Sequence, residues 1–198
     1  MKILLVGASG VLGTAIAAEL GARHDIIRAG RTGDVRIDIR DPASIRAAFE
    51  EIGTCDAVIS AAGKVKFAPL AEMTAEDYAI GIADKLMGQV NLVLIGKDFV
   101  SEGGSFTLTT GVLAHDPIRK GTSASMVNGA VDSFVKAASI ELPRGQRINA
   151  VSPGVLLESM GGYAPFFRGH EPVPAARAAL AFSKSVEGAL TGQVFSVL

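Results

Sequence analysis

A glycine-rich turn near the beginning of the chain carries the residue types that hold phosphate groups. It reads Gly7-Ala8-Ser9-Gly10-Val11-Leu12-Gly13 and lies between an apolar run and a helical pattern. Gly7 permits a tight turn, Gly10 lets the backbone approach a pyrophosphate, and Gly13 lets the helix pack on the strand. Backbone N–H groups and the dipole at the start of the helix would then bind the anion. The segment predicts a dinucleotide site, and a glycine-rich turn without a ligand is the alternative.

The elements that position this turn follow from hydrophobic periodicity. Short apolar runs of β type alternate with longer helical patterns, which predicts a parallel sheet covered on both faces. Strands are expected at residues 2–6, 26–29, 56–60, 104–110, 147–152 and 192–197. Helices are expected at residues 11–20, 42–52, 74–100, 122–142 and 174–186. Asp41 is the expected N-cap of the second helix, and Thr74 opens a capping box for the third.

One connection is too short for a parallel crossover. Only residues 30–34 separate the second strand from a strand-like stub at 35–38, whereas a crossover usually takes about a dozen residues or more. We therefore expect the helix between strands 2 and 3 to be missing. The predicted fold class is α/β, a single Rossmann-type doubly wound parallel sheet over residues 1–198 with that helix lost.

Composition and charge exclude several classes of protein. Of 198 residues, 48% are hydrophobic and 20% are charged, which excludes a disordered chain. The net charge is -1 and no basic run occurs, so neither nucleic acid nor a membrane surface is an expected partner. Cys55 is the single cysteine, and no Cys/His cluster has zinc spacing. The first apolar run stops at Gly7, short of a signal peptide, and we expect no membrane span and no metal site. A cytoplasmic domain is predicted.

Several segments resemble the short-chain dehydrogenase/reductase family. The glycine turn, in which the first two glycines are three positions apart, resembles that family's turn, and Ala61-Ala62-Gly63 resembles its Asn-Asn-Ala-Gly segment. Residues 147–154 are similar to its sixth strand and residues 191–194 to its last. The resemblance, which covers nearly the whole chain, implies a nicotinamide cofactor. It implies cofactor contacts from Gly7, Ser9, Gly10, Val11, Leu12, Gly13, Arg31, Thr32, Asp38, Ile39, Ala61, Ala62, Gly63, Pro153, Gly154 and Val155.

The end of the second strand indicates which nicotinamide cofactor is expected. It reads Ala29-Gly30-Arg31-Thr32 and lacks the carboxylate that accepts the ribose hydroxyls of NAD. Arg31 is placed for the 2′-phosphate of NADP, although a solvated surface arginine is the alternative. Asp34 is near enough to compete for the ribose. We therefore predict NADP(H), with NAD(H) less favoured, and Asp38-Ile39 resembles the family's pair of residues at the adenine.

The resemblance breaks at the catalytic positions. The family usually carries an Asn, a Ser, a Tyr and a Lys, and these fall here on Lys85, Thr109, Thr122 and Met126, with Thr110 next to Thr109. A threonine hydroxyl is a far weaker acid than a phenol, whose pKa is about 10. Thr122 therefore cannot simply replace tyrosine, and Met126 brings no charge.

Three residues are candidates for a substitute proton donor. Lys85 could bring an ammonium to the nicotinamide ribose from the neighbouring helix, and partial burial would lower its pKa. His115 follows the fifth strand and could reach the substrate, and Tyr163 lies in the loop where the family has its substrate lid. The alternatives are a solvated helix lysine, a loop histidine without a role and a packing tyrosine. Tyr78 is expected to lie far from the nicotinamide.

The lid and two helices complete the predictions. The lid, about residues 155–173, contains several apolar and aromatic side chains, which favours an apolar or aromatic small-molecule substrate, although a mobile apolar lid explains them equally. By resemblance, small residues on the fourth and fifth helices suit a homodimer or homotetramer. The leading hypothesis is an NADP(H)-dependent oxidoreductase acting on a small carbonyl, C=N or activated C=C group oriented by Thr109 or Thr110. A catalytically silent NADP(H)-binding regulator and a non-redox enzyme are the rivals.

Overall fold

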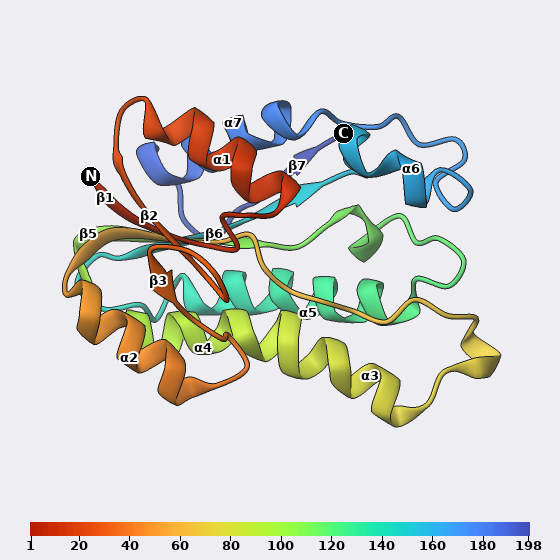
Figure 1. Cartoon of the computed structure of the whole chain (residues 1–198), viewed down its shortest axis with the longest axis horizontal. Helices are drawn as coiled ribbons and strands as arrows, with labels where there is room; N and C mark the ends of the chain where they lie inside the picture. The colour runs from red at the N-terminus through yellow and green to blue at the C-terminus, as the bar shows by residue number, and fades with distance from the viewer.

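Seven parallel strands form one sheet in the computed structural model, which describes residues 1–198 (Figure 1). The strands are β1 (Lys2–Val6), β2 (Asp25–Gly30), β3 (Val35–Arg36), β4 (Cys55–Ser60), β5 (Val100–Thr109), β6 (Arg147–Pro153) and β7 (Val194–Val197). Their order across the sheet is β3-β2-β1-β4-β5-β6-β7. The chain therefore builds outward from β1 on one side and from β4 on the other, and this reversal opens a crevice at the carboxyl ends of those two strands.

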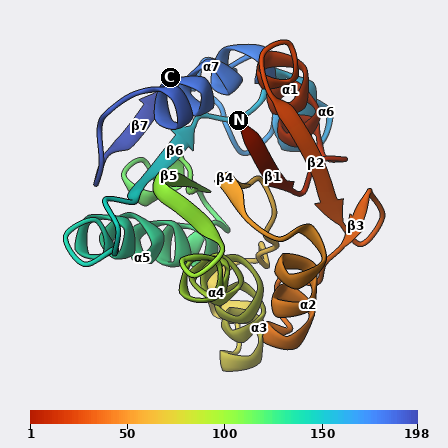
Figure 2. The same ribbon diagram turned by 90° about the vertical axis from the view of Figure 1, so that its left-hand side faces the viewer.

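Helices cover both faces of the sheet, as Figures 1 and 2 show. One face carries α1 (Val11–Gly21) and α7 (Ala175–Glu187). The other carries α2 (Pro42–Ile52), α3 (Ala75–Gly81), α4 (Met87–Gly96) and α5 (Thr122–Ala138). The short helix α6 (Met160–Tyr163) lies in the segment predicted to be a lid, and 3-10 turns occur at Leu70–Glu72, Val112–Ala114 and Leu157–Ser159. The predicted α/β fold is confirmed.

Alternation along β1 divides the hydrophobic core into two layers. Leu4 and Val6 pack with Phe49 of α2 on one face, in a cluster of 20 buried residues. Ile3 and Leu5 pack with Phe182 of α7 on the other, in a cluster of 14. Because successive side chains of a strand point to opposite faces, one central strand supports both helical layers. The rigid sheet that results holds the loops at the carboxyl ends of its strands.

The local signals that end or begin elements behave as predicted. The Asp41 side chain accepts a hydrogen bond from the backbone N–H of Ala43, at the start of α2. Thr74 and Asp77 form the reciprocal capping box of α3. No helix separates β2 from β3, so the missing crossover helix is confirmed as well.

Two helical predictions are wrong at their carboxyl ends. The helix expected at 74–100 consists of α3, a π-helical segment (Ile82–Leu86) and α4, and it ends at Gly96. Gly96, the last residue of α4, packs closely against α2: a Cβ on Gly96 would lie 2.7 Å from the Phe49 ring. The strand expected from residue 104 begins instead at Val100. The helix expected at 122–142 ends at Ala138 and continues only as turns.

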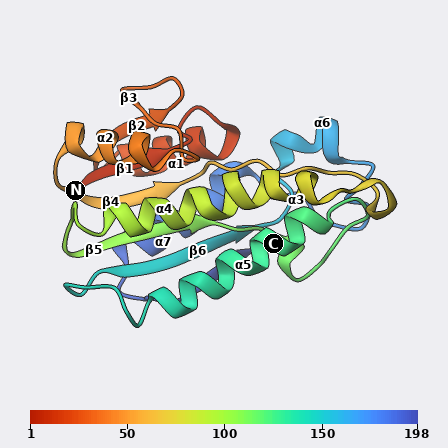
Figure 3. The same cartoon turned by 90° about the horizontal axis from the view of Figure 1, so that it is seen from below.

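The run from Ala75 to Gly96 is long and apolar enough to cross a membrane, judged by length and composition alone. Glu76, Asp77, Asp84 and Lys85 interrupt this run, so it is not the continuous apolar stretch of about 18 residues whose absence the sequence predicts. In the fold, Leu92 and Val93 of this run are buried in the core. Core helices pass the same test, and here the run forms part of one helical layer (Figure 3).

Candidate cofactor and proton-transfer site

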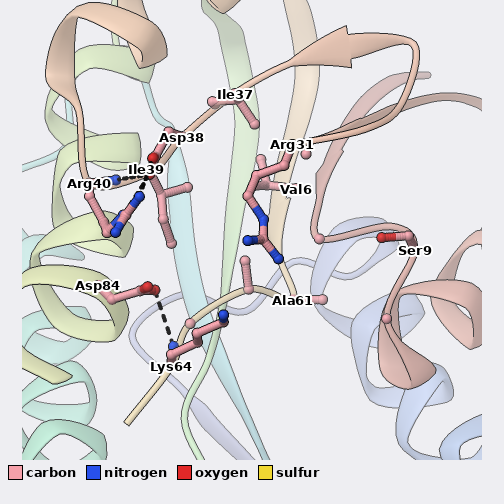
Figure 4. Close-up of a pocket in the computed structure, with 15 residues that line it drawn as sticks. Val6, Ser9, Arg31, Ile37, Asp38, Ile39, Arg40, Ala61, Lys64 and Asp84 are labelled. Carbon is pink, nitrogen blue, oxygen red and sulfur yellow. Dashed lines mark hydrogen bonds and ion pairs between the residues drawn. The ribbon is translucent and has the colours of Figure 1, made fainter. Parts of the chain in front are cut away.

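A cavity of about 360 Å³ lies at the carboxyl ends of β1, β2 and β4, within the crevice that the strand order creates (Figure 4). Nine of the residues predicted to contact a cofactor come together around it. The residues that line it are Val6, Gly7, Ser9, Gly10, Gly30, Arg31, Ile37, Asp38, Ile39, Arg40, Ala61, Ala62, Gly63, Lys64 and Asp84.

The glycine-rich turn has the shape that close approach by a ligand requires. Gly7 has a φ of +85°, and a Cβ there would lie 2.8 Å from the backbone of Ala61. A Cβ at Gly13 would lie 2.1 Å from the carbonyl oxygen of Gly7, so only glycine lets α1 pack this closely. At Gly10 the nearest atom to a Cβ would be 3.5 Å away, and no side chain caps the start of α1. Gly10 lines the cavity beside uncapped N–H groups, which fits a phosphate group.

Arg31 is the cationic residue at the end of β2, and its side chain points into the cavity in Figure 4. The competing carboxylate of Asp34 is turned elsewhere. Asp34 Oδ2 accepts a hydrogen bond from the backbone N–H of Arg28 at 3.0 Å, and Asp34 does not line the cavity. The end of β2 therefore presents the Arg31 guanidinium to the cavity and not the Asp34 carboxylate.

Asp38 is paired with an arginine that the sequence analysis did not single out. Arg40 Nη2 lies 2.6 Å from Asp38 Oδ2, and Arg40 Nε lies 3.0 Å from Oδ1. These hydrogen bonds, with a smaller contribution from the charge on Arg31, lower the pKa of Asp38 to about 2. The carboxylate is ionised at neutral pH and can accept a further hydrogen bond, as the predicted adenine contact requires.

The remaining residues predicted to contact the cofactor lie outside this cavity. Leu12 and Gly13 are buried and pack α1 against the sheet. Val11 and Thr32 are exposed and do not line it. Pro153 ends β6, and the two residues after it, Gly154 and Val155, line a second cavity described below.

Lys85 lies in the π-helical segment between α3 and α4. Its side chain packs directly on Gly63, where a Cβ would be 2.8 Å from Lys85 Cγ. Lys85 Nζ donates a hydrogen bond to the carbonyl oxygen of Thr110 at 3.2 Å. Burial lowers the pKa of Lys85 to about 8, and the charge of the buried Asp132 carboxylate opposes this shift. π-Helical segments occur frequently at functional sites, and this one brings a partly deprotonated amine to the carboxyl end of β5.

The hydroxyls of the two threonines at the end of β5 donate hydrogen bonds to backbone carbonyl groups of the protein. Thr109 Oγ1 donates to the carbonyl oxygen of Ser60 at 2.6 Å, and Thr110 Oγ1 donates to that of Asn128 at 3.0 Å. Thr110 is buried, so its expected role in orienting a substrate carbonyl does not agree with its placement. The Thr109 hydroxyl has already committed its proton, so in this arrangement it can only accept a hydrogen bond from a substrate.

A tyrosine lies beside the altered tyrosine position after all. The hydroxyls of Tyr78 and Thr122 are 2.8 Å apart and hydrogen-bonded. The two helices approach closely because the neighbouring Gly81 has no side chain, and a Cβ there would lie 3.0 Å from Ser123 Oγ. This contact between α3 and α5 joins residues far apart in the sequence, so the position of Tyr78 along its own helix does not reveal it. Met126, at the position of the family's lysine, is exposed.

A second cavity, of about 340 Å³, lies past the carboxyl ends of β6 and β7. Two imidazoles line it, each near a carboxylate. His115 Nε2 lies 3.2 Å from Oδ2 of Asp132, and His170 Nδ1 lies 3.5 Å from Oδ2 of Asp116. The full lining is Val112, His115, Asp116, Ser152, Gly154, Val155, Gly169, His170, Glu171, Ser196 and Leu198. No lysine or arginine is among these residues, and only three are hydrophobic.

The aromatic side chains of the lid pack against one another. Tyr163 lies edge-on to Phe67 and to Phe167, with ring centroids 6.0 and 6.1 Å apart, and Phe167 lies edge-on to His170. Glu158 accepts hydrogen bonds from the backbone N–H of Ala175 at the start of α7. These contacts account for the lid residues as packing and helix capping, so they do not by themselves indicate an aromatic ligand.

Comparison with known proteins agrees with this architecture. The family model described as enoyl-(acyl carrier protein) reductase matches residues 7–197. The chain therefore belongs to the short-chain dehydrogenase/reductase family, a family of oxidoreductases.

Individual relatives span a range of similarity. The chain is 29% identical over 132 residues to the short chain dehydrogenase claC of Passalora fulva, which covers 64% of this chain and 49% of that protein. Versicolorin reductase 1 of Aspergillus parasiticus is 28% identical over 183 residues, covering 79% of this chain and 70% of that protein. The chain thus spans about half the length of several curated relatives that it matches.

Two solved structures share the fold. The protein lin1944 of Listeria innocua is 53% identical, with all of both chains covered and a TM-score of 0.99. A small-chain dehydrogenase in complex with NADPH is 23% identical, covers all of this chain and 96% of its own, and has a TM-score of 0.89.

Proposed function

We propose that this protein is an NADP(H)-dependent oxidoreductase that transfers hydride to or from a small carbonyl, C=N or activated C=C substrate. The observation that carries the proposal is the cavity at the carboxyl ends of β1, β2 and β4. It combines an open glycine turn with an inward-pointing arginine. NADP(H), when bound there, supplies or accepts a hydride at C4 of its nicotinamide.

Different residues of the cavity would bind different parts of the dinucleotide. The uncapped N–H groups after Gly10 would hold the pyrophosphate. Arg31 would pair with the 2′-phosphate, because its guanidinium can donate two parallel hydrogen bonds to phosphate oxygens. Asp34 is tied to the backbone of Arg28, which removes the carboxylate that would favour NAD(H). The solved small-chain dehydrogenase with NADPH supports a cofactor of this type in the same fold.

Lys85 is the proposed proton donor. With a pKa of about 8, its ammonium is a stronger acid than an ordinary lysine, and a catalytic acid is most effective when its pKa lies near the working pH. Transfer occurs from Nζ to the substrate heteroatom or carbon, directly or through one water. His115 remains a second candidate, since it lines the cavity beside Gly154 and Val155.

The substrate that best fits the site is small and polar. The lid sequence favoured an apolar or aromatic substrate, but its aromatic side chains contact one another. Six of the eleven residues that line the open space next to Gly154 and Val155 carry hydroxyl, imidazole or carboxylate groups. Because no lysine or arginine side chain lines it, an anionic substrate is disfavoured.

Consumption of NADPH tests the proposal. A panel of polar carbonyl compounds, imines and enones is offered to the wild-type protein and to Lys85→Ala. We expect Lys85→Ala to lower turnover by at least about tenfold with little change in NADPH affinity. Lys136→Ala, at an exposed position of α5, is the matched control and should keep full activity. Unchanged turnover in Lys85→Ala would remove Lys85 from the mechanism.

The absence of tyrosine and lysine at 122 and 126 favours one alternative, a nucleotide-binding regulator without catalytic activity. Tight NADPH binding with no turnover across the whole panel would favour that alternative.

A further inference from the structure

Gln89 is a fully buried polar residue of α4 that the sequence analysis did not single out. Its carboxamide makes three hydrogen bonds, all to backbone groups. Nε2 donates to the carbonyl oxygens of Lys85 and Thr109, each at 3.0 Å, and Oε1 accepts from the N–H of Thr109 at 2.8 Å. Both donors and the acceptor are therefore used, and the side chain has one defined orientation.

These hydrogen bonds join the π-helical segment to the end of the sheet. Thr109 is the last residue of β5, and Gln89 binds both its N–H and its carbonyl oxygen. Hydrogen bonds of a π-helix run from residue i to i+5, so the regular i to i+4 pattern is interrupted in such a segment. The Gln89 side chain provides a donor to the backbone of Lys85 from four residues further along.

The ammonium of Lys85 is held against the same stretch of strand. Its Nζ donates to Thr110, the residue that follows Thr109, and its methylene groups pack on Gly63. The backbone of Lys85 is thus fixed relative to Thr109, and its side-chain terminus relative to Thr110. A change in the register between α4 and β5 would separate these contacts.

We infer that Gln89 is a positioning residue: its carboxamide locks the π-helical segment onto the end of β5 and thereby holds the Lys85 ammonium in its desolvated position. Gln89 acts through Lys85 and contacts no substrate or cofactor. The catalytic meaning of this arrangement rests on the proposed role of Lys85, whereas the arrangement itself can be tested without any substrate.

The pH dependence of acylation of Lys85 by an amine-reactive reagent reports this arrangement directly. The rate of modification is followed by mass spectrometry on the full chain, and its midpoint gives the pKa of the amine independently of how accessible the amine is. The wild-type midpoint is expected at about 8. In Gln89→Met, which fills similar volume without the hydrogen bonds, Lys85 becomes better solvated. Its midpoint should rise by at least about one pH unit, a tenfold decrease in the acid dissociation constant.

Gln146 provides a matched control. It is also buried, and its carboxamide donates to the backbone carbonyls of Lys97 and Val100 at the opposite end of β5. Gln146→Met should lower stability as Gln89→Met does, yet leave the Lys85 midpoint unchanged. Should Gln89→Met fail to fold, Gln89→Leu serves instead, since it is also uncharged, is of similar size and lacks the hydrogen bonds to Lys85 and Thr109. The same rise of the midpoint is expected in this variant.

A wild-type midpoint in both Gln89 variants, or an equal rise in Gln146→Met, would overturn the inference. Failure of the proposed function gives a different result. In that case Lys85→Ala would retain turnover, while the shift of the midpoint in Gln89→Met would still be observed.

Discussion

Replacing Lys85 by methionine should stabilise the fold at neutral pH while removing activity. The pKa of this amine falls from 10.5 to about 8 on folding because the ammonium is desolvated. Each pH unit corresponds to about 1.4 kcal/mol, so keeping the group protonated in the folded state costs about 3 kcal/mol. The lost hydrogen bond to Thr110 offsets about 1 kcal/mol of this gain. The expected net gain for Lys85→Met at pH 7 is therefore about 1–3 kcal/mol.

The sign of the pH dependence follows from the direction of the shift. A lowered folded-state pKa means that the unfolded chain binds more protons between about pH 8 and 10.5. The cost in the wild type is fully present below pH 8 and disappears as the pH rises through 10.5. The advantage of Lys85→Met should accordingly shrink over that range. Urea unfolding at pH 7 and at pH 10.5 measures both values.

Lys136→Met, at an exposed position of α5, serves as the control and should change stability by less than about 0.5 kcal/mol. A loss of stability in Lys85→Met at pH 7, or a gain of the same size at both pH values, would refute the reasoning.

Other predictions address the core and the outer helices. Burial, together with the charge on Asp56, raises the pKa of the Cys55 thiol to about 12. Thiol reagents at pH 8 should therefore modify Cys55 only after the protein unfolds. Rapid labelling of the folded protein would contradict this prediction. A Gly13→Ala substitution places a Cβ 2.1 Å from the Gly7 carbonyl oxygen. It should therefore lower the midpoint of thermal unfolding and weaken NADPH binding. The control Gly129→Ala, with nothing near its Cβ position, should have neither effect. Helices α4 and α5 leave Met87, Leu94 and Met126 exposed, and we expect a homodimer or homotetramer in sedimentation equilibrium; a monomer at micromolar concentration would end that proposal.

The fold was predictable because its determinants are local. The glycine turn, the Asp41 and Thr74 caps and the short link before β3 are each encoded within a few residues. Because apolar side chains of the strands point to both faces of the sheet, each face must be covered by a layer of helices. Local spacing also predicts that Arg31 directly follows β2, and there it lines the cavity.

The details of the proton-transfer region were not predictable in the same way. The contact between Tyr78 and Thr122 joins residues 44 positions apart and depends on how closely α3 and α5 approach. The π-helical segment depends on a hydrogen-bonding pattern that hydrophobic periodicity does not reveal. Gln89 gave one weak signal, since a glutamine amid the apolar residues of a helix needs buried partners. Its partners lie on β5, and only the folded chain identifies them.

Calorimetric titration with NADPH and NADH, on the wild type and on Arg31→Ala, tests the central claim most directly. The account predicts that the wild type binds NADPH more tightly than NADH. Arg31→Ala should lose about 10- to 100-fold in NADPH affinity, the value of a charge-assisted hydrogen-bonded pair, with little change for NADH. Absence of heat with either nucleotide at millimolar concentration would contradict the account.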